Sequence, residues 1–212
     1  MRHVNIVFVT LAAMLAIAAA PGAGAQDSAP VPPDQTAHVA ELLDIFNQGC
    51  LHAYPAGSLA AYAANLKGEK LSREEFVRRV HIEEKTGDGW AVTGKSGNYV
   101  ILSSEGYEDV ARPVVAGMGN NETCTVIGTG PAGMPLLEPY RALKAQYAAE
   151  AGLTLSKATT IPMPARPGMA PGLMDLQFAK ERFVAFAYAM VQRPGEDVEY
   201  RLDFKPAPAK AK

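Results

Sequence analysis

Hydrophobic positions between residues 36 and 80 recur at helical spacing and predict three helices. The first helix should begin at Thr36 and end near Pro55. One face of this helix carries Val39, Leu42, Leu43, Phe46 and Cys50. A second, short helix is expected after Ser58. A third is expected after Ser72, because Glu75 stands three residues later and completes a capping box.

Beyond residue 85 the pattern changes to an alternation of hydrophobic and polar residues, which is typical of strands. The segments that alternate in this way are 90–93, 98–102, 113–116, 123–127, 184–190 and 198–205. A helix from Pro139 to Ala151 separates them into two groups, and Gly152 is its expected stop. Residues 162–172 hold four prolines and predict an irregular loop.

This order of elements indicates an α+β fold. We expect N-terminal helices packed on one face of a mostly antiparallel sheet, with one further helix between strand groups. Regular alternation of strand and helix is absent, which disfavours a doubly wound parallel sheet, and no internal repeat of fixed period is visible. The chain then divides into a signal peptide (1–25), a flexible lead-in (26–35), a single α+β domain (36–206) and a disordered tail (207–212).

The N-terminal residues have the features of a secretory signal peptide. Arg2 gives a basic start, an apolar run covers 7–20, and residues 23–25 supply the small side chains that signal peptidase requires. Cleavage is expected before Gln26. A membrane anchor is disfavoured because the apolar run is shorter than the roughly 18–20 residues that span a bilayer. We therefore expect a periplasmic or secreted protein with no membrane span in the mature chain.

Composition and charge add two exclusions. The chain is 48% hydrophobic and 20% charged, which excludes wholesale disorder. Its 20 basic and 22 acidic side chains give a net charge of −2. This balance provides no electrostatic reason to expect a nucleic acid as partner.

Cys50 and Cys124 are the two cysteines of the chain. Two cysteines of one domain usually pair in an oxidising compartment, so we expect a structural disulfide between them. The alternatives are two free buried thiols or a redox pair. The wide spacing is unlike the Cys-x-x-Cys motif of redox proteins, which disfavours the second alternative.

A short pattern accompanies these cysteines. It consists of Phe46, Cys50 and Leu51 at a helix end, Trp90 and Tyr99 in a strand region, and the lone second cysteine, Cys124. In these features residues 40–127 resemble a family of uncharacterised exported proteobacterial proteins. The resemblance implies export and a disulfide. Because that family has no assigned activity, it implies no catalytic residues.

Residues 89–96 match the phosphate-loop pattern G-x-x-x-x-G-K-[ST] letter for letter. Such a loop follows a buried strand and opens a helix, whose N-terminus faces the phosphates. Here the preceding stretch is polar, and the residues after Gly97 are β-branched and aromatic, which predicts a strand. We therefore favour a hairpin turn at 94–97 over nucleotide binding.

Residues 128–133 match a second glycine pattern, G-x-G-x-x-G, between a predicted strand and a predicted helix. Pro131 and Pro135 lack the N–H groups that a pyrophosphate would need. No acidic residue stands about 20 residues further on to bind a ribose. We favour a plain strand-to-helix connection, and no cofactor is expected.

Histidines and serines are the remaining candidates for chemistry. His38, His52 and His81 are scattered and form no H-E-x-x-H motif, so no metal site is expected. His38 and Glu41 are interpreted as ordinary surface chemistry at a helix start. Ser96 lies outside a G-x-S-x-G motif, and no histidine stands beside it in the sequence.

In the absence of a convergent polar set, we assign no catalytic residue. We expect an exported non-catalytic binding or accessory protein of the cell envelope, whose partner is an unknown envelope protein or a small ligand. The alternative is a small secreted hydrolase with acid/base residues assembled in the fold, His52 or His81 beside a carboxylate. The aromatic residues of the last two strands either pack in the core, as we expect, or line the pocket of a small-ligand carrier.

Overall fold

The computed structural model describes residues 33–80, 86–105, 122–164, 171–179, 184–192 and 197–206. Several predicted segments lie outside these residues: the signal peptide (1–25), residues 26–32 of the lead-in, the strand 113–116, the turn 193–195 and the tail (207–212). No helix of the described part is long and apolar enough to cross a membrane.

Four α-helices and one π-helix are described. They are α1 (Pro33–Ile45), the π-helix η1 (Phe46–Ala53), α2 (Leu59–Asn65), α3 (Arg73–Val80) and α4 (Leu137–Glu150). The first helix therefore begins before Thr36 and continues as a π-helix. The capping box is confirmed, because the Glu75 N–H donates to Ser72 Oγ (3.2 Å) and the Ser72 N–H donates to Glu75 Oε2 (3.3 Å). Ser58 makes no such cap and donates its hydroxyl to the carbonyl of Ala53 (3.1 Å).

All described strands belong to one antiparallel sheet. They are β1 (Glu69–Lys70), β2 (Thr86–Thr93), β3 (Asn98–Glu105), β4 (Thr123–Gly130), β5 (Thr159–Met163), β6 (Gly172–Ala179), β7 (Val184–Gln192) and β8 (Val198–Lys205). Their order in the sheet is β1-β2-β3-β4-β8-β7-β6-β5. The predicted α+β class with an antiparallel sheet is confirmed, and the sheet dominates the structure.

The strand order is symmetric about its centre. β4 and β8 pair there, from Cys124 opposite Phe204 to Gly130 opposite Val198. On either side lies a three-stranded meander, β2-β3-β4 or β6-β7-β8, and α1 or α4 precedes it in the chain. The two halves share the order of these elements but not their spacing. This difference explains why no repeat of fixed period is visible in the sequence.

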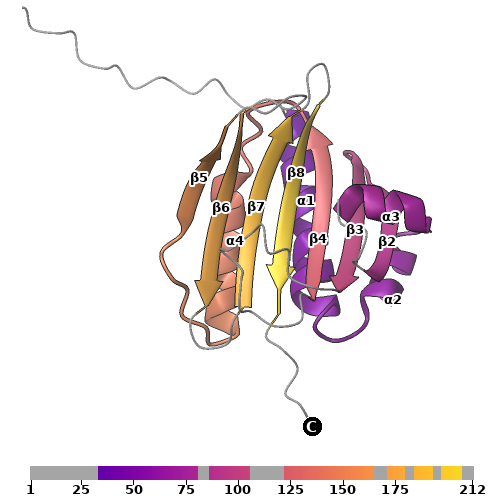
Figure 1. Ribbon diagram of the computed structural model, residues 1–212, viewed down its shortest axis with the longest axis horizontal. Helices are drawn as coiled ribbons and strands as arrows, with labels where there is room; N and C mark the ends of the chain where they lie inside the picture. Colours follow the sequence, from indigo (N-terminus) through magenta and orange to yellow (C-terminus); the bar gives the residue numbers. More distant parts are fainter. Residues whose placement is uncertain are drawn as a thin grey trace, which may run out of the picture. The chain divides into compact units, whose positions relative to one another are not determined.

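Helices α1 and α4 lie on the same face of the sheet (Figure 1). The buried hydrophobic residues that β4, β7 and β8 contribute to this side are Cys124, Val126, Val184, Phe186, Tyr188, Val198, Tyr200, Leu202 and Phe204. Tyr147 of α4 meets the rings of Phe186 and Phe204 edge-on, at centroid distances of 6.0 and 5.5 Å. The described aromatic residues of the last two strands are therefore core residues, as expected.

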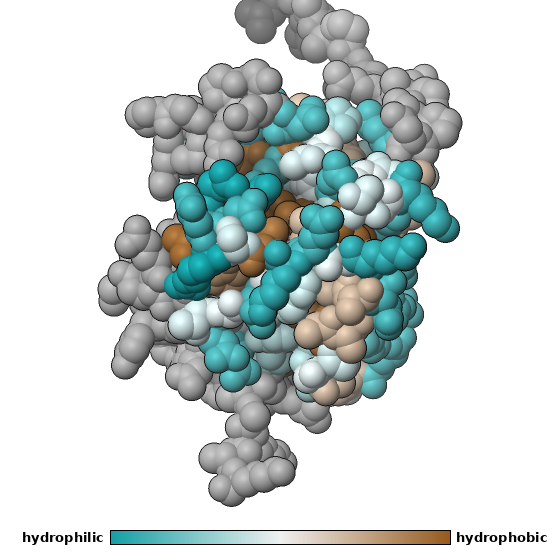
Figure 2. All heavy atoms as spheres, turned by 90° about the vertical axis from the view of Figure 1, so that its right-hand side faces the viewer, coloured by the Kyte–Doolittle hydropathy of each residue, from teal (hydrophilic) through white to brown (hydrophobic). Residues whose placement is uncertain are grey.

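Helix α3 lies on the opposite face of the sheet, where Figure 1 draws it in front of β3 and β2. Phe76 of α3 forms a second buried cluster there with Leu102 and Ile127. The expectation that helices cover one face only is therefore wrong. The reason is that Leu102 and Ile127 point away from α1 and α4 and need their own cover. Seen from the β2 edge, hydrophilic side chains cover most of this side and hydrophobic ones show between them (Figure 2).

The structure adds β5 and β6, which the sequence pattern did not predict. The irregular loop expected at 162–172 is wrong for residues 162–163, which belong to β5, and for Gly172, which begins β6. Pro162 is tolerated because β5 is an edge strand, where one row of N–H groups has no sheet partner. β6 escaped prediction because Asp175 and Gln177 occupy its helix-facing side, where alternation requires apolar residues.

The expected disulfide between Cys50 and Cys124 is present. It joins η1 to β4 across 74 residues of sequence, and both cysteines are fully buried. Thiol exchange requires access of a thiolate to one of the sulfurs, and burial prevents that access in the folded protein. The bond is therefore placed for stability and not for redox chemistry.

Candidate functional site

The hairpin turn between β2 and β3 binds a carboxylate of α1. The N–H groups of Lys95 and Ser96 donate to the two carboxylate oxygens of Glu41, at 2.8 and 2.7 Å. The hydroxyls of Ser96 and Tyr99 also donate to Oε2 of Glu41, the latter at 3.0 Å. This is the turn that matches the phosphate-loop pattern. Its N–H groups do bind an anion, but that anion is the chain's own Glu41.

These hydrogen bonds shift the titration of Glu41. Burial works to raise the pKa of its carboxyl group, because it disfavours the charged form. The hydrogen bonds from the Ser96 hydroxyl, the two backbone N–H groups and Tyr99 outweigh burial and lower the pKa from 4.5 to about 2. The ionised carboxylate is therefore a stabilising part of the fold at neutral pH.

We expect Glu41→Gln to remove a pH-dependent part of the stability. The folded-state pKa of Glu41 is lowered, so its contribution is complete above pH 4.5 and is lost as the pH falls toward 2. The variant should be about 1–2 kcal/mol less stable at pH 7, after allowance for solvent screening, and the difference should shrink in acid. Urea unfolding between pH 7 and pH 3 measures this. Glu74→Gln on the exposed surface of α3 is the control, and a pH-independent loss in Glu41→Gln would contradict the assignment.

His38 lies one helical turn before Glu41 and is buried, with 6% of its surface exposed. Its ring stacks on Tyr99 at a centroid distance of 5.1 Å. Its Nδ1 lies 3.0 Å from both the carbonyl oxygen of Ser96 and the hydroxyl of Tyr99. Its Nε2 has no hydrogen-bond partner in the described part of the chain. The interpretation of His38 and Glu41 as surface chemistry is therefore wrong, since both hold the hairpin turn against α1.

The fold thus brings a histidine next to Ser96, which the sequence order did not indicate. Nucleophilic catalysis requires the serine hydroxyl to be hydrogen-bonded to an imidazole nitrogen. Here the hydroxyl of Ser96 donates to Glu41, and Nδ1 of His38 faces the backbone carbonyl of Ser96 instead. His38, Glu41, Ser96 and Tyr99 therefore have the geometry of a structural cluster and not of a catalytic triad.

The second glycine motif also serves the packing. A Cβ atom on Gly128 would lie 3.1 Å from a methyl carbon of Leu42, so the glycine allows α1 to approach the sheet. After the strand, the hydroxyl of Tyr200 donates to the carbonyl of Pro131 (2.6 Å) and accepts from the N–H of Met134 (3.1 Å). These contacts support the strand-to-helix connection that we expected from the motif.

A second polar cluster lies under α4 and is centred on Asp175 of β6. Arg141 binds its carboxylate with two nitrogens, at 2.6 and 3.4 Å, and Lys144 Nζ lies 3.3 Å from Oδ2. The hydroxyl of Thr160 donates to Oδ1 at 2.8 Å. The side chains of Asp175 and Lys144 are completely buried. Arg141 also binds the exposed Glu138 at 2.7 Å, so two carboxylates balance the two cations.

Burial and pairing oppose each other in this cluster. Burial lowers the pKa of Lys144 from its ordinary value, and the charge of Asp175 offsets only part of this effect. For Asp175 burial acts to raise the pKa, but the hydrogen bonds from Arg141 and Thr160 and the charge of Lys144 prevail and lower it. The ammonium group of Lys144 also lies 4.6 Å from the ring centre of Tyr140. Lys144 and Asp175 therefore form a buried ion pair, in which the charge of each side chain stabilises the charge of the other.

Of the other two histidines singled out in the sequence, the structure describes only His52. His52 is exposed on η1, and its ring meets Tyr147 edge-on at 6.1 Å. Among the described residues, no carboxylate hydrogen-bonds to it. His81 lies outside the described residues. Within the described ranges, no three His, Cys, Asp or Glu side chains are grouped to hold a metal ion.

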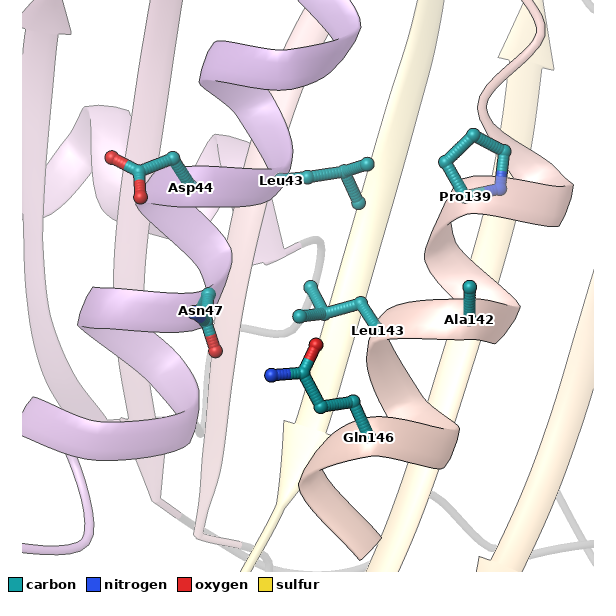
Figure 3. Close-up of a pocket in the computed structure, with 7 residues that line it drawn as sticks. All are labelled: Leu43, Asp44, Asn47, Pro139, Ala142, Leu143 and Gln146. Carbon is teal, nitrogen blue, oxygen red and sulfur yellow. The ribbon is translucent and has the colours of Figure 1, made fainter. Parts of the chain in front are cut away.

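A groove of about 360 Å³ opens between α1–η1 and α4 on the outer side of the helix layer (Figure 3). The residues that line it are Leu43, Asp44, Asn47, Pro139, Ala142, Leu143 and Gln146. Leu43 points toward α4 and Leu143 points toward α1; in the view, Asn47 lies below Leu43, and Gln146 lies below Leu143. Apolar side chains with a few polar groups at the margin are typical of binding surfaces.

Sequence reasoning missed the groove and both polar clusters. Glu41 and Ser96 are 55 residues apart, and Arg141 and Asp175 are 34 apart, so no local spacing connects them. One signal was available: Asp175 interrupts a hydrophobic stretch, and an acid in such a place needs a partner when buried. The groove left no signal of its own, because Leu43 belongs to the helical face that was expected to lie in the core.

Comparisons of the chain with protein-family models, with curated proteins and with solved structures find no match. The resemblance to an exported family therefore stays a prediction.

Proposed function

We propose that this is an exported, non-catalytic binding protein of the cell envelope, and that it binds its partner in the groove between α1 and α4. The observation that carries the proposal is the groove itself, in which Leu43 and Leu143 form an apolar floor that stays partly exposed. Leaving such side chains in water costs free energy that a bound partner would recover.

The two polar clusters support a binding role, because their carboxylates are already engaged in hydrogen bonds and ion pairs within the fold. Glu41 accepts hydrogen bonds from the hairpin turn and Tyr99, and Asp175 is held by Arg141, Lys144 and Thr160. An acid/base catalyst needs a titratable group that faces a substrate with a pKa near the working pH. The pKa values of both carboxyl groups are lowered, and neither faces the groove.

The buried disulfide supports export. Disulfides persist in the periplasm and outside the cell, whereas the cytosol keeps most thiols reduced. The bond between Cys50 and Cys124 agrees with the signal peptide predicted at residues 1–25. A periplasmic or secreted location and an envelope partner, either a protein or a small ligand, remain part of this proposal.

The function is tested by crosslinking within the cells that produce the protein. A photoreactive residue at Ala142, in the groove, is compared with one at Ala61, which is exposed on α2 outside it. We expect Ala142 to give a crosslinked species of defined mass that Ala61 does not give. Native mass spectrometry of the purified protein covers the case of a small ligand. Equal crosslinking at both positions, together with the absence of a bound small molecule, would overturn the proposal.

A further inference from the structure

The surface around the groove is built from short side chains. Pro139 and Ala142 on α4 are both exposed and line the groove together with Leu43 and Leu143. Short side chains allow a further helix to lie close to the backbones of α1 and α4. The two helices and the apolar groove between them form a surface that suits the apolar face of an amphipathic helix.

The exposed charged side chains described on the two helices that form the groove are all acidic. The exposed charged side chains described on α1 and α4 are Asp44, Glu138 and Glu150. The two cations of α4, Arg141 and Lys144, turn inward to Asp175, and Arg141 also compensates Glu138. Asp44 lines the groove, and Glu150 accepts a hydrogen bond from Gln146, another lining residue (2.9 Å). On the described parts of α1 and α4, the margin of the groove therefore presents the carboxylates of Asp44 and Glu150, and neither of the two cations of α4 pairs with them.

From this arrangement we infer that the groove takes a basic amphipathic helix of a partner protein, with its leucine-like face on Leu43 and Leu143 and its lysines or arginines toward Asp44 and Glu150. The inference rests on the function proposed above and specifies the chemistry of the partner. A second copy of this chain is disfavoured, because it would bring two acidic margins together with no cation between them. Like charges at an interface suppress such pairing.

The inference is tested with two synthetic helices of about 15 residues, long enough to lie along α4. Both carry the same leucine face, and their other positions are lysine in one and glutamate in the other. Fluorescence anisotropy measures their binding to the purified full-length protein. We expect the lysine peptide to bind at least about tenfold more tightly, with a preference that weakens as salt is added.

A matched pair of variants assigns the effect to the groove. Asp44→Lys should lower the affinity for the lysine peptide about three- to tenfold. Glu74→Lys changes the net charge by the same amount on the exposed surface of α3, and it should leave the affinity unchanged. Circular dichroism confirms that both variants fold. Equal losses in the two variants, equal binding of the two peptides, or self-association that competes with the peptide would overturn the inference.

The two proposals fail in different ways. If Ala142 crosslinks a partner but the peptides bind without regard to their charge, the binding function stands and the basic partner is refuted. If the lysine peptide binds and Asp44→Lys weakens it, but no crosslink or small ligand is found in cells, the chemistry of the groove stands and the proposed function is refuted.

Discussion

Asp175→Asn is expected to destabilise the protein by about 3–5 kcal/mol, the typical effect of removing one partner from a buried ion pair. Lys144 would then be completely buried with no countercharge, and Arg141 would lose its main acceptor. Urea unfolding at pH 7 measures the loss. Removing Asp175 also lowers the pKa of Lys144 further. A group with a lowered folded-state pKa loses stability as the pH falls, so the deficit should shrink as the pH rises toward about 10.

Two further variants separate the buried charge from general damage to the cluster. Glu138→Gln removes the exposed carboxylate that also binds Arg141, and it should cost less than about 1 kcal/mol. Replacing both partners by apolar residues, Lys144→Met with Asp175→Leu, should restore most of the stability, because no unpaired charge remains in the core. An Asp175→Asn protein within 1 kcal/mol of the parent, on the scale expected for an exposed pair, would refute this account.

Removing the disulfide is the second change with a large expected effect. In the double variant Cys50→Ala, Cys124→Ala, the unfolded chain gains the freedom of a loop that spans 74 residues of sequence. The chain-entropy model puts this effect at about 4–5 kcal/mol. The cavities left by two buried sulfur atoms increase the loss. Urea unfolding of the purified variant against the oxidised parent protein measures it.

A redox control separates the stability that the disulfide bond contributes from the stability that the packing of the two sulfur atoms contributes. The parent protein unfolded with a reducing agent present lacks the bond but keeps both sulfur atoms. Its stability should therefore lie below that of the oxidised parent by about 4–5 kcal/mol and above that of the double variant by the part of the loss that the cavities cause. In native buffer the same reagent should reduce the disulfide of the folded protein slowly, since both cysteines are fully buried. Rapid reduction of the folded protein, or a double variant as stable as the parent, would contradict a structural disulfide.

Local signals in the sequence predicted much of the fold. The box of Ser72 and Glu75 starts α3 because both residues act within one turn, and the alternation along β8 follows from its single apolar side. The sequence pattern did not predict β6, because the acidic residue Asp175 lies on its core-facing side, where the alternation requires an apolar residue. Whether such an acid is buried depends on Arg141 and Lys144, which another element supplies.

The candidate site was less predictable than the fold, and the reason is again distance along the chain. Gly94, Lys95 and Ser96 indicated a turn, which is confirmed by the N–H of Gly94 donating to the carbonyl of Gly97 (2.8 Å). That the turn would bind Glu41 follows only from the packing of α1 on β2 and β3. The groove likewise depends on how two helices lie side by side on the sheet, and hydrophobic periodicity does not specify that distance.

The position of the last strand has a consequence for how the chain acquires its structure. β8 lies between β4 and β7, so the final strand in the sequence joins the two halves of the sheet. A nascent chain that has not yet reached Val198 lacks the central pairing, whatever its earlier segments have formed. The two halves of the sheet therefore cannot pair at the centre until residues Val198–Lys205 have been synthesised. Truncation before residue 198 should therefore abolish cooperative folding of the whole protein.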